Sequence, residues 1–100
     1  MQDKSNVDIG NIARMSEIAE VYKITNQSKK SQKYHKSIIH ICDKYPRNEK
    51  ILQYKIRSLN QLNKTYKSLE TTNDLLKVNP YNTVALINIA NHLKEEKHAF

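Results

Sequence analysis

Residues that break regular structure are almost absent from this sequence. Its 100 residues include one glycine, two prolines, one phenylalanine and no tryptophan. Sandwiches and barrels need frequent Gly and Pro turns, so this scarcity, beside many Lys, Leu, Ile, Asn and Gln residues, favours an all-helical chain. The length is enough for one domain with a modest core and too short for two independent cores.

Cysteine and long apolar runs are scarce as well. The single cysteine, Cys42, excludes an internal disulfide framework and offers no zinc-ligand spacing, which fits a reducing compartment. No stretch approaches the roughly 18 consecutive apolar residues of a membrane span, and residues 1–22 contain no apolar run typical of a signal peptide. We therefore expect a cytoplasmic protein with no membrane partner.

Motifs of catalysis and of cofactor binding are missing. One glycine cannot build a Gly-rich phosphate loop, and no Ser-His-Asp or paired-carboxylate constellation stands out. No two of the four histidines have the i, i+3 or i, i+4 spacing that places two imidazoles on one helical face, so we expect solvated side chains and no metal site at His35, His40, His92 and His98. The sequence predicts a protein that is not an enzyme and has no cofactor.

A repeat of 34 residues organises what is present. Pro46 and Pro80 lie 34 residues apart; each is followed two positions later by an asparagine and six positions later by a leucine, at Leu52 and Leu86. Periods of about 20 to 50 residues indicate stacked supersecondary units, and 34 is the period of a helix-turn-helix repeat. Cys42 corresponds to Leu76 one repeat later, which predicts a buried structural thiol.

Apolar positions spaced three and four residues apart predict five amphipathic helices. Asn11, Asn48 and Asn82 are the expected N-terminal caps, and Asn63 is expected in the left-handed conformation that ends a helix. Proline ends the second and fourth helices because the preceding residue is restricted to extended conformations. The predicted ranges are residues 11–26, 31–44, 48–61, 64–78 and 82–97.

These positions resemble the tetratricopeptide repeat family, and NPYNTVALINIANHLKEE, residues 79–96, is the clearest match. Leu86, Ile89, Ala90 and Leu93 occupy the packing positions of a first helix there. The resemblance covers residues 12–96 and departs from the family pattern where Lys55 replaces a leucine. It implies a right-handed superhelix of about two and a half helical hairpins. The implied organisation is a flexible arm at 1–10, a repeat domain at 11–97 with units 12–46, 47–80 and 81–97, and a tail at 98–100.

The family's pattern implies that the first helix of each unit lines a concave groove in which a peptide or partner helix lies. Transferred to this sequence, that groove is basic and rich in amides, which suits an acidic protein or peptide. Positions that hold a chaperone tail in some family members read Ala19, Lys23, Tyr54, Val84 and Asn88, which argues against that ligand. The predicted partner-binding residues are Lys23, Lys50, Gln53, Tyr54, Arg57, Asn88 and Asn91.

Two alternative functions remain open. The formal net charge is +7, and KKSQKYHK, residues 29–36, places Lys29, Lys30, Lys33 and Lys36 around Tyr34, so the cluster could follow phosphates while the tyrosine stacks on an unpaired base. The fifth helix lacks a second helix to complete its hairpin, so a second copy of the chain could cover it in a self-associating scaffold.

Overall fold

Five helices and the turns between them make up the fold. The computed structural model describes residues 4–98, with side chains described through residue 95, and contains no strand in that range. The all-α prediction with five helices is confirmed. The molecule is flat, with principal extents of 50 × 36 × 17 Å. The helices are α1 (Ser5–Ile24), α2 (Ser28–Cys42), α3 (Glu49–Gln61), α4 (Thr65–Val78) and α5 (Thr83–His98).

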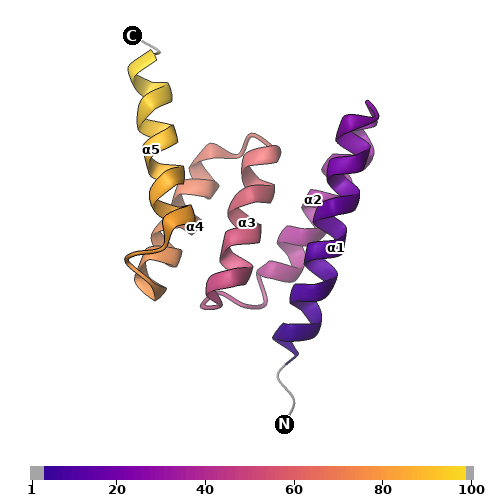
Figure 1. Cartoon of the computed structure of the whole chain (residues 1–100), viewed down its shortest axis with the longest axis horizontal. Coiled ribbons are helices and arrows are strands. Elements are labelled where there is room, and N and C mark those ends of the chain that lie inside the picture. The colour runs from indigo at the N-terminus through magenta and orange to yellow at the C-terminus, as the bar shows by residue number, and fades with distance from the viewer. Residues whose placement is uncertain (1–3, 99–100) are drawn as a thin grey trace.

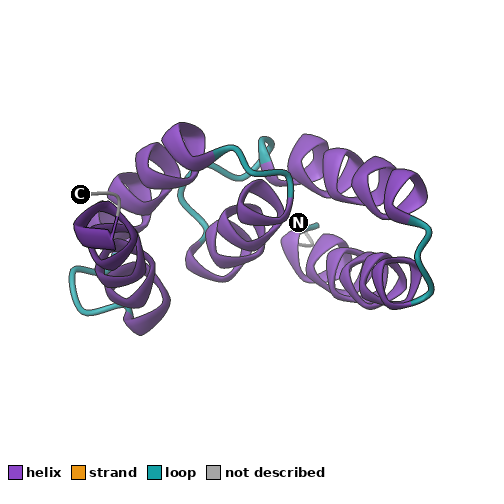
Figure 2. Cartoon of the chain, turned by 90° about the horizontal axis from the view of Figure 1, so that it is seen from above, coloured by secondary structure: helices purple, strands orange, loops and turns teal. Residues whose placement is uncertain are grey.

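The helices stand in two rows. Figure 1 shows α1, α3 and α5 side by side at the front and α2 and α4 behind them, and Figure 2 shows the two rows from above. Each helix is antiparallel to the next because the connecting turns are short. One face of the molecule is therefore built from α1, α3 and α5, the three helices predicted to line a binding surface.

Asparagines lie at several of the helix ends. Asn48 Oδ1 accepts a hydrogen bond from the Ile51 amide at 3.0 Å, and Asn82 Oδ1 accepts one from the Ala85 amide at the same distance. Both predicted caps are confirmed. Asn63 has φ 58°, as predicted, and Asn26 has φ 60° at the end of α1. Asparagine adopts this left-handed conformation more readily than most residues, so it replaces the glycine that usually ends a helix.

The predicted start of the first helix is wrong. Residues 5–10 were placed in a flexible arm and Asn11 at a cap, yet α1 begins at Ser5 and Asn11 lies inside it. Tertiary contacts explain the difference, because Ile9 packs against the core and Tyr45 Oη donates a hydrogen bond to Asp8 Oδ2. Gly10 faces open space and costs the helix only its weak propensity. Residues 1–3 of the predicted arm lie outside the described residues.

Smaller shifts occur elsewhere. The second helix begins three residues before the predicted start, at Ser28, and ends at Cys42. His98 is the last residue of α5, whereas it was predicted to open the tail; residues 99–100 are outside the described range. These differences are within the usual uncertainty of helix ends.

The core consists of two apolar clusters that share α3. One cluster contains Ile12, Ile38, Cys42 and Ile51, and the other contains Leu52, Ile56, Leu75 and Ala85. Neighbouring residues of α3, Ile51 and Leu52, therefore enter different clusters. Helix α3 therefore contributes to both apolar clusters. The side of α3 that enters neither cluster is available to face solvent.

Candidate functional site

A cleft of about 380 Å³ lies between α3 and α5. One face of each helix lines it, because residues spaced three and four apart project to the same side of a helix. Its lining residues are Lys50, Gln53, Tyr54, Ile56, Arg57, Asn60 and Gln61 from α3, and Val84, Ile87, Asn88 and Asn91 from α5.

Most of the predicted partner-binding residues meet in this one cleft. Lys23 is the exception: it lies on α1, where its Nζ donates a hydrogen bond to Gln61 Oε1 at 3.0 Å, at the edge of the cleft. Its amine therefore extends the cationic surface toward α1 without lining the cleft itself. The predicted residues that do line the cleft are Lys50, Gln53, Tyr54, Arg57, Asn88 and Asn91.

The charged side chains that line the cleft are all cationic. Lys50 and Arg57 are exposed cations, and no Asp or Glu lines this cleft among the residues that the structure describes. The Arg57 guanidinium lies 5.9 Å from the centroid of the Tyr54 ring, a cation–π contact that restrains both side chains. Lys55 points elsewhere and pairs with Asp43 at 2.8 Å, which explains how a lysine is tolerated where the repeat pattern has a leucine.

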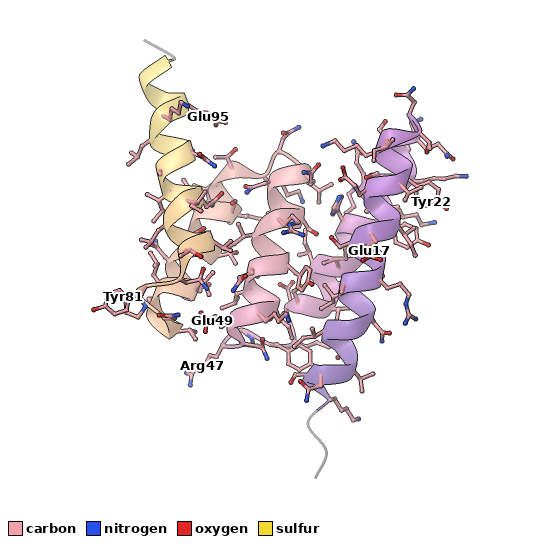
Figure 3. All side chains as sticks on the ribbon, viewed as in Figure 1. Glu17, Tyr22, Arg47, Glu49, Tyr81 and Glu95 are labelled. Atoms are coloured by element: carbon pink, nitrogen blue, oxygen red, sulfur yellow. The ribbon has the colours of Figure 1, made fainter. Side chains whose placement is uncertain are left out.

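Hydrogen bonds join α3 to the turn before α5 at one end of the cleft and to α5 itself at the other end. At one end Glu49 Oε1 accepts from Asn79 Nδ2 at 2.7 Å and from Asn82 Nδ2 at 2.8 Å. At the other end Asn60 Nδ2 donates to Asn88 Oδ1 at 2.9 Å. Figure 3 shows Glu49 at the start of α3, beside the turn that leads into α5. The cleft is thus held at a set width before any partner arrives.

The two amide donors, Asn82 first and Asn79 second, lower the pKa of Glu49. They do so because they stabilise its charged form. The carboxylate is therefore ionised at neutral pH and fixes the turn before α5. Sequence analysis missed this role of Glu49, since its partners lie 30 and 33 residues away.

Asn88 has a different role from the one predicted. Its Nδ2 donates to Ser68 Oγ at 3.1 Å and to Thr72 Oγ1 at 2.9 Å, while its Oδ1 accepts from Asn60. Both amide hydrogens are therefore used inside the protein, and only one acceptor position of Oδ1 remains for a partner. Asn88 joins α3, α4 and α5. The side chain of Asn91, one turn later, makes no hydrogen bond among the described residues and presents a free amide.

A second, smaller cleft adjoins the first. It has a volume of about 230 Å³ and shares Asn60, Asn88 and Asn91 with the larger one. Its other lining residues include Ser68, His92 and Glu95, so its character is polar and not cationic. Figure 3 shows Glu95 near the far end of α5. A bound partner that extended past the Asn60–Asn88 hydrogen bond would contact the basic residues of the larger cleft and the polar residues of the smaller one.

The predicted phosphate-binding lysines lie on α2. Lys29, Lys30, Lys33 and Lys36 are all exposed, but Lys30 Nζ lies 5.5 Å from the centroid of the Tyr22 ring. Tyr34 is half-buried and packs against Tyr22 with the ring centroids 5.6 Å apart. The tyrosine proposed to stack on a base is therefore already in contact with a ring of the protein.

Histidine burial was predicted wrongly at one position. His35 is only 4% exposed, and its Nδ1 lies 2.9 Å from Ser58 Oγ on α3. His40 is exposed, His92 is half-buried, and the side chain of His98 is outside the described set. Residues 4–95 contain no group of three or more His, Cys, Asp or Glu side chains placed to hold a metal ion.

Cys42 is buried, as predicted, and is 1% exposed. Loss of solvation raises the pKa of its thiol to about 12, outweighing the opposing effect of Lys55. The neutral thiol acts as a core side chain.

Within the described chain, no helix has both the length and the apolar character needed to cross a bilayer.

Comparison with known proteins found no counterpart: no family model, curated protein or solved structure has a significant match to this chain.

Proposed function

We propose that this protein is a non-enzymatic interaction module whose cleft between α3 and α5 binds an acidic peptide, or an acidic face of a helix, from another protein. The observation that carries the proposal is the lining of that cleft, in which Lys50 and Arg57 stand beside Tyr54 with no carboxylate among the described lining residues. Cationic and aromatic side chains in one preformed concavity suit anionic groups attached to an apolar body.

The cleft supplies a different contact for each part of such a ligand. Arg57 can form two parallel hydrogen bonds with a carboxylate, and Lys50 adds a second positive charge about two helical turns away along α3. Val84 and Ile87 offer apolar contact from the α5 side. Gln53 and Asn91 are placed to hydrogen-bond a peptide backbone. Because the tethers at Glu49 and Asn88 already hold the helices apart, binding needs little reordering of the protein.

We further propose that the fold is a short right-handed array of tetratricopeptide-like units working in the cytoplasm. Two features support the array. Helices α3 and α5 begin at Glu49 and Thr83, one 34-residue period apart, and each is capped by an asparagine that follows a proline by two residues. A single buried thiol supports a reducing compartment.

Titration with designed peptides tests the binding proposal. The probe is a labelled peptide of about 12 residues that alternates Glu with Leu and Ala, and its counterpart carries Lys in place of Glu. Amide NMR of the labelled protein should show shifts along Lys50–Arg57 and Val84–Asn91 with the acidic probe only. Arg57→Glu should weaken binding about ten- to a hundredfold, because a charge-assisted pair becomes a repulsion.

Arg47→Glu is the matched control, since it makes the same charge change at an exposed arginine outside the cleft. Equal losses of affinity in the two variants would mean that binding depends only on net charge, which would overturn the proposal.

A labelled single-stranded oligonucleotide tests the alternative function, in which the lysines of α2 bind nucleic acid. If it binds more tightly than the acidic peptide at physiological salt and is lost when Lys29, Lys30 and Lys33 become Gln, the lysines of α2 are the binding surface.

A further inference from the structure

The outer side of α5 carries an apolar stripe made of Leu86, Ala90 and Leu93. Their spacing of four and three residues places them on one face of the helix. Leu86 is 47% exposed and Leu93 is 54% exposed, while Ala85, which packs in one cluster with Leu75 of α4, is buried. Figure 1 shows α5 at the edge of the molecule, with α4 as its neighbour on one side only. Leu86 and Leu93 are therefore among the exposed large apolar side chains of the described chain.

The equivalent stripe of α3 is covered. Leu52, Ile56 and Leu59 precede Leu86, Ala90 and Leu93 by one 34-residue period, and all three are buried. Leu52 and Ile56 pack in one cluster with Leu75 of α4. Within residues 4–98, α5 has no following helix in the place that α4 takes beside α3. The stripe therefore matches a surface that a helix packs against elsewhere in the same fold.

The surroundings of the stripe are unusual in a basic chain. The net charge is +7, yet no Asp, Glu, Lys or Arg occurs between Lys77 and Lys94, the longest interval of this kind in the sequence. Two copies of the chain repel each other through most of their surface. Leu86 and Ala90 lie inside this uncharged interval, and Leu93 lies at its end beside Lys94, so the repulsion is weakest along the first three turns of α5.

The stripe is also complementary to itself. Leu86 and Leu93 lie seven residues apart, with the small Ala90 between them. If two copies pair about a two-fold axis near Ala90, their α5 helices run antiparallel and Leu86 of one copy meets Leu93 of the other. Alanine at the crossing lets the helix axes approach to about 8 Å, the close end of the usual range.

Two further apolar side chains lie near the stripe. Val78 and Tyr81 adjoin the start of α5 and are 40% and 84% exposed, and Figure 3 shows Tyr81 directed away from the helices at this edge. With Leu86, Ala90 and Leu93 they give this edge five exposed apolar or aromatic side chains.

From these features we propose that the protein forms a two-fold symmetric dimer through α5, with Leu86 and Leu93 packed against each other across Ala90. The occupant of the exposed stripe is thus a second copy of this chain. Val84 and Ile87 lie on a different side of α5 and line the cleft, so the dimer leaves both clefts open. Each dimer presents two basic clefts, and the pair would bind a partner that carries two acidic segments with higher avidity than a single copy.

Sedimentation velocity tests the dimer directly. Between about 10 and 200 µM the wild-type chain should pass from its 11.7 kDa monomer mass toward twice that value. Leu93→Glu should remain monomeric throughout, because two carboxylates would be buried at the interface. Val21→Glu places the same charge on an apolar residue of α1 that is 58% exposed, and it should dimerise like the wild type. Far-UV circular dichroism establishes that both variants keep their helices.

A wild-type chain that is monomeric at 200 µM overturns the proposal, and so does a Leu93→Glu variant that dimerises as strongly as the wild type. Loss of dimer in Val21→Glu alone would move the interface to α1. Cross-linking provides a second measurement that does not depend on a glutamate variant. Ala90→Cys should form a disulfide-linked dimer under mild oxidation, since the two thiols lie near the axis, whereas Val21→Cys should not. Cys42 is buried and does not compete.

Discussion

His35 on α2 and Ser58 on α3 form a buried hydrogen bond, with His35 Nδ1 2.9 Å from Ser58 Oγ. Both side chains are almost fully enclosed, at 4% and 2% exposure. Burial lowers the pKa of His35 because the charged imidazolium loses solvation; Glu20 opposes this shift and Lys23 adds to it. The imidazole is therefore held neutral between the two hairpins, and it links them through this polar contact.

The His35 contact makes stability depend on pH. The unfolded imidazole has a pKa near 6.5, and the folded one titrates below that value, so the unfolded state binds more protons in between. The free energy of unfolding should fall as pH drops through 6.5 and stop changing from this cause below the folded pKa. Urea unfolding between pH 8 and pH 5 measures it. His35→Gln should remove this part of the pH dependence, while His40→Gln, at an exposed position of the same helix, should keep it.

Glu49 produces a second pH effect in a lower window. Its pKa is lowered by hydrogen bonds from Asn82 and Asn79, so the stability it contributes is present above the usual carboxyl pKa and is lost as pH falls through the folded value. Glu49→Gln should lower the melting temperature at pH 7 and make no difference at pH 2. Glu17→Gln, at an exposed site on α1, is the control and should change neither value. A Glu49→Gln deficit that persisted unchanged into acid would refute the role of the charge.

Asn88 and Asn91 should behave differently although they lie one turn apart. Asn88→Ala removes three hydrogen bonds that join α5 to α3 and α4, and should cost about 1–3 kcal/mol of unfolding free energy. Asn91→Ala removes an exposed amide with no hydrogen bond inside the described chain and should change stability by less than about 0.5 kcal/mol. Urea unfolding of both variants measures the two changes in the free energy of unfolding. Equal stabilities would show that the Asn88 bonds contribute nothing net.

Cys42 should resist thiol reagents in the folded protein. A pKa of about 12 leaves about a thousandfold less thiolate than an exposed cysteine has near neutral pH, and burial blocks access as well. Labelling with iodoacetamide at pH 8 should therefore follow the rate of unfolding and accelerate in urea. Prompt modification without denaturant would mean that the α2–α3 layer opens readily.

Local signals in the sequence predicted much of this architecture. A spacing of three and four residues between apolar positions identified five helices, and asparagines two residues after each proline identified the caps of α3 and α5. Cys42 was predicted to be buried from its place in the repeat. The resemblance to the tetratricopeptide repeat pattern selected Lys50, Gln53, Tyr54 and Arg57, and these residues share one face of α3 because helix geometry alone decides which residues share a face.

Only the tertiary structure decided the features that depend on distant partners. The burial of His35 follows from Ser58, 23 residues away, and the helical state of residues 5–10 follows from the packing of Ile9 and the bond between Asp8 and Tyr45. Asn88 appeared to be a ligand-binding amide until its own bonds to α3 and α4 were known. The sequence by itself therefore determined the number of helices, the caps of α3 and α5 and the faces of the helices, which are set by neighbouring residues. The width of the cleft and the assignment of each polar side chain to the interior or to a ligand were decided by tertiary packing, because a polar group commits to whichever partner the fold brings within hydrogen-bond distance.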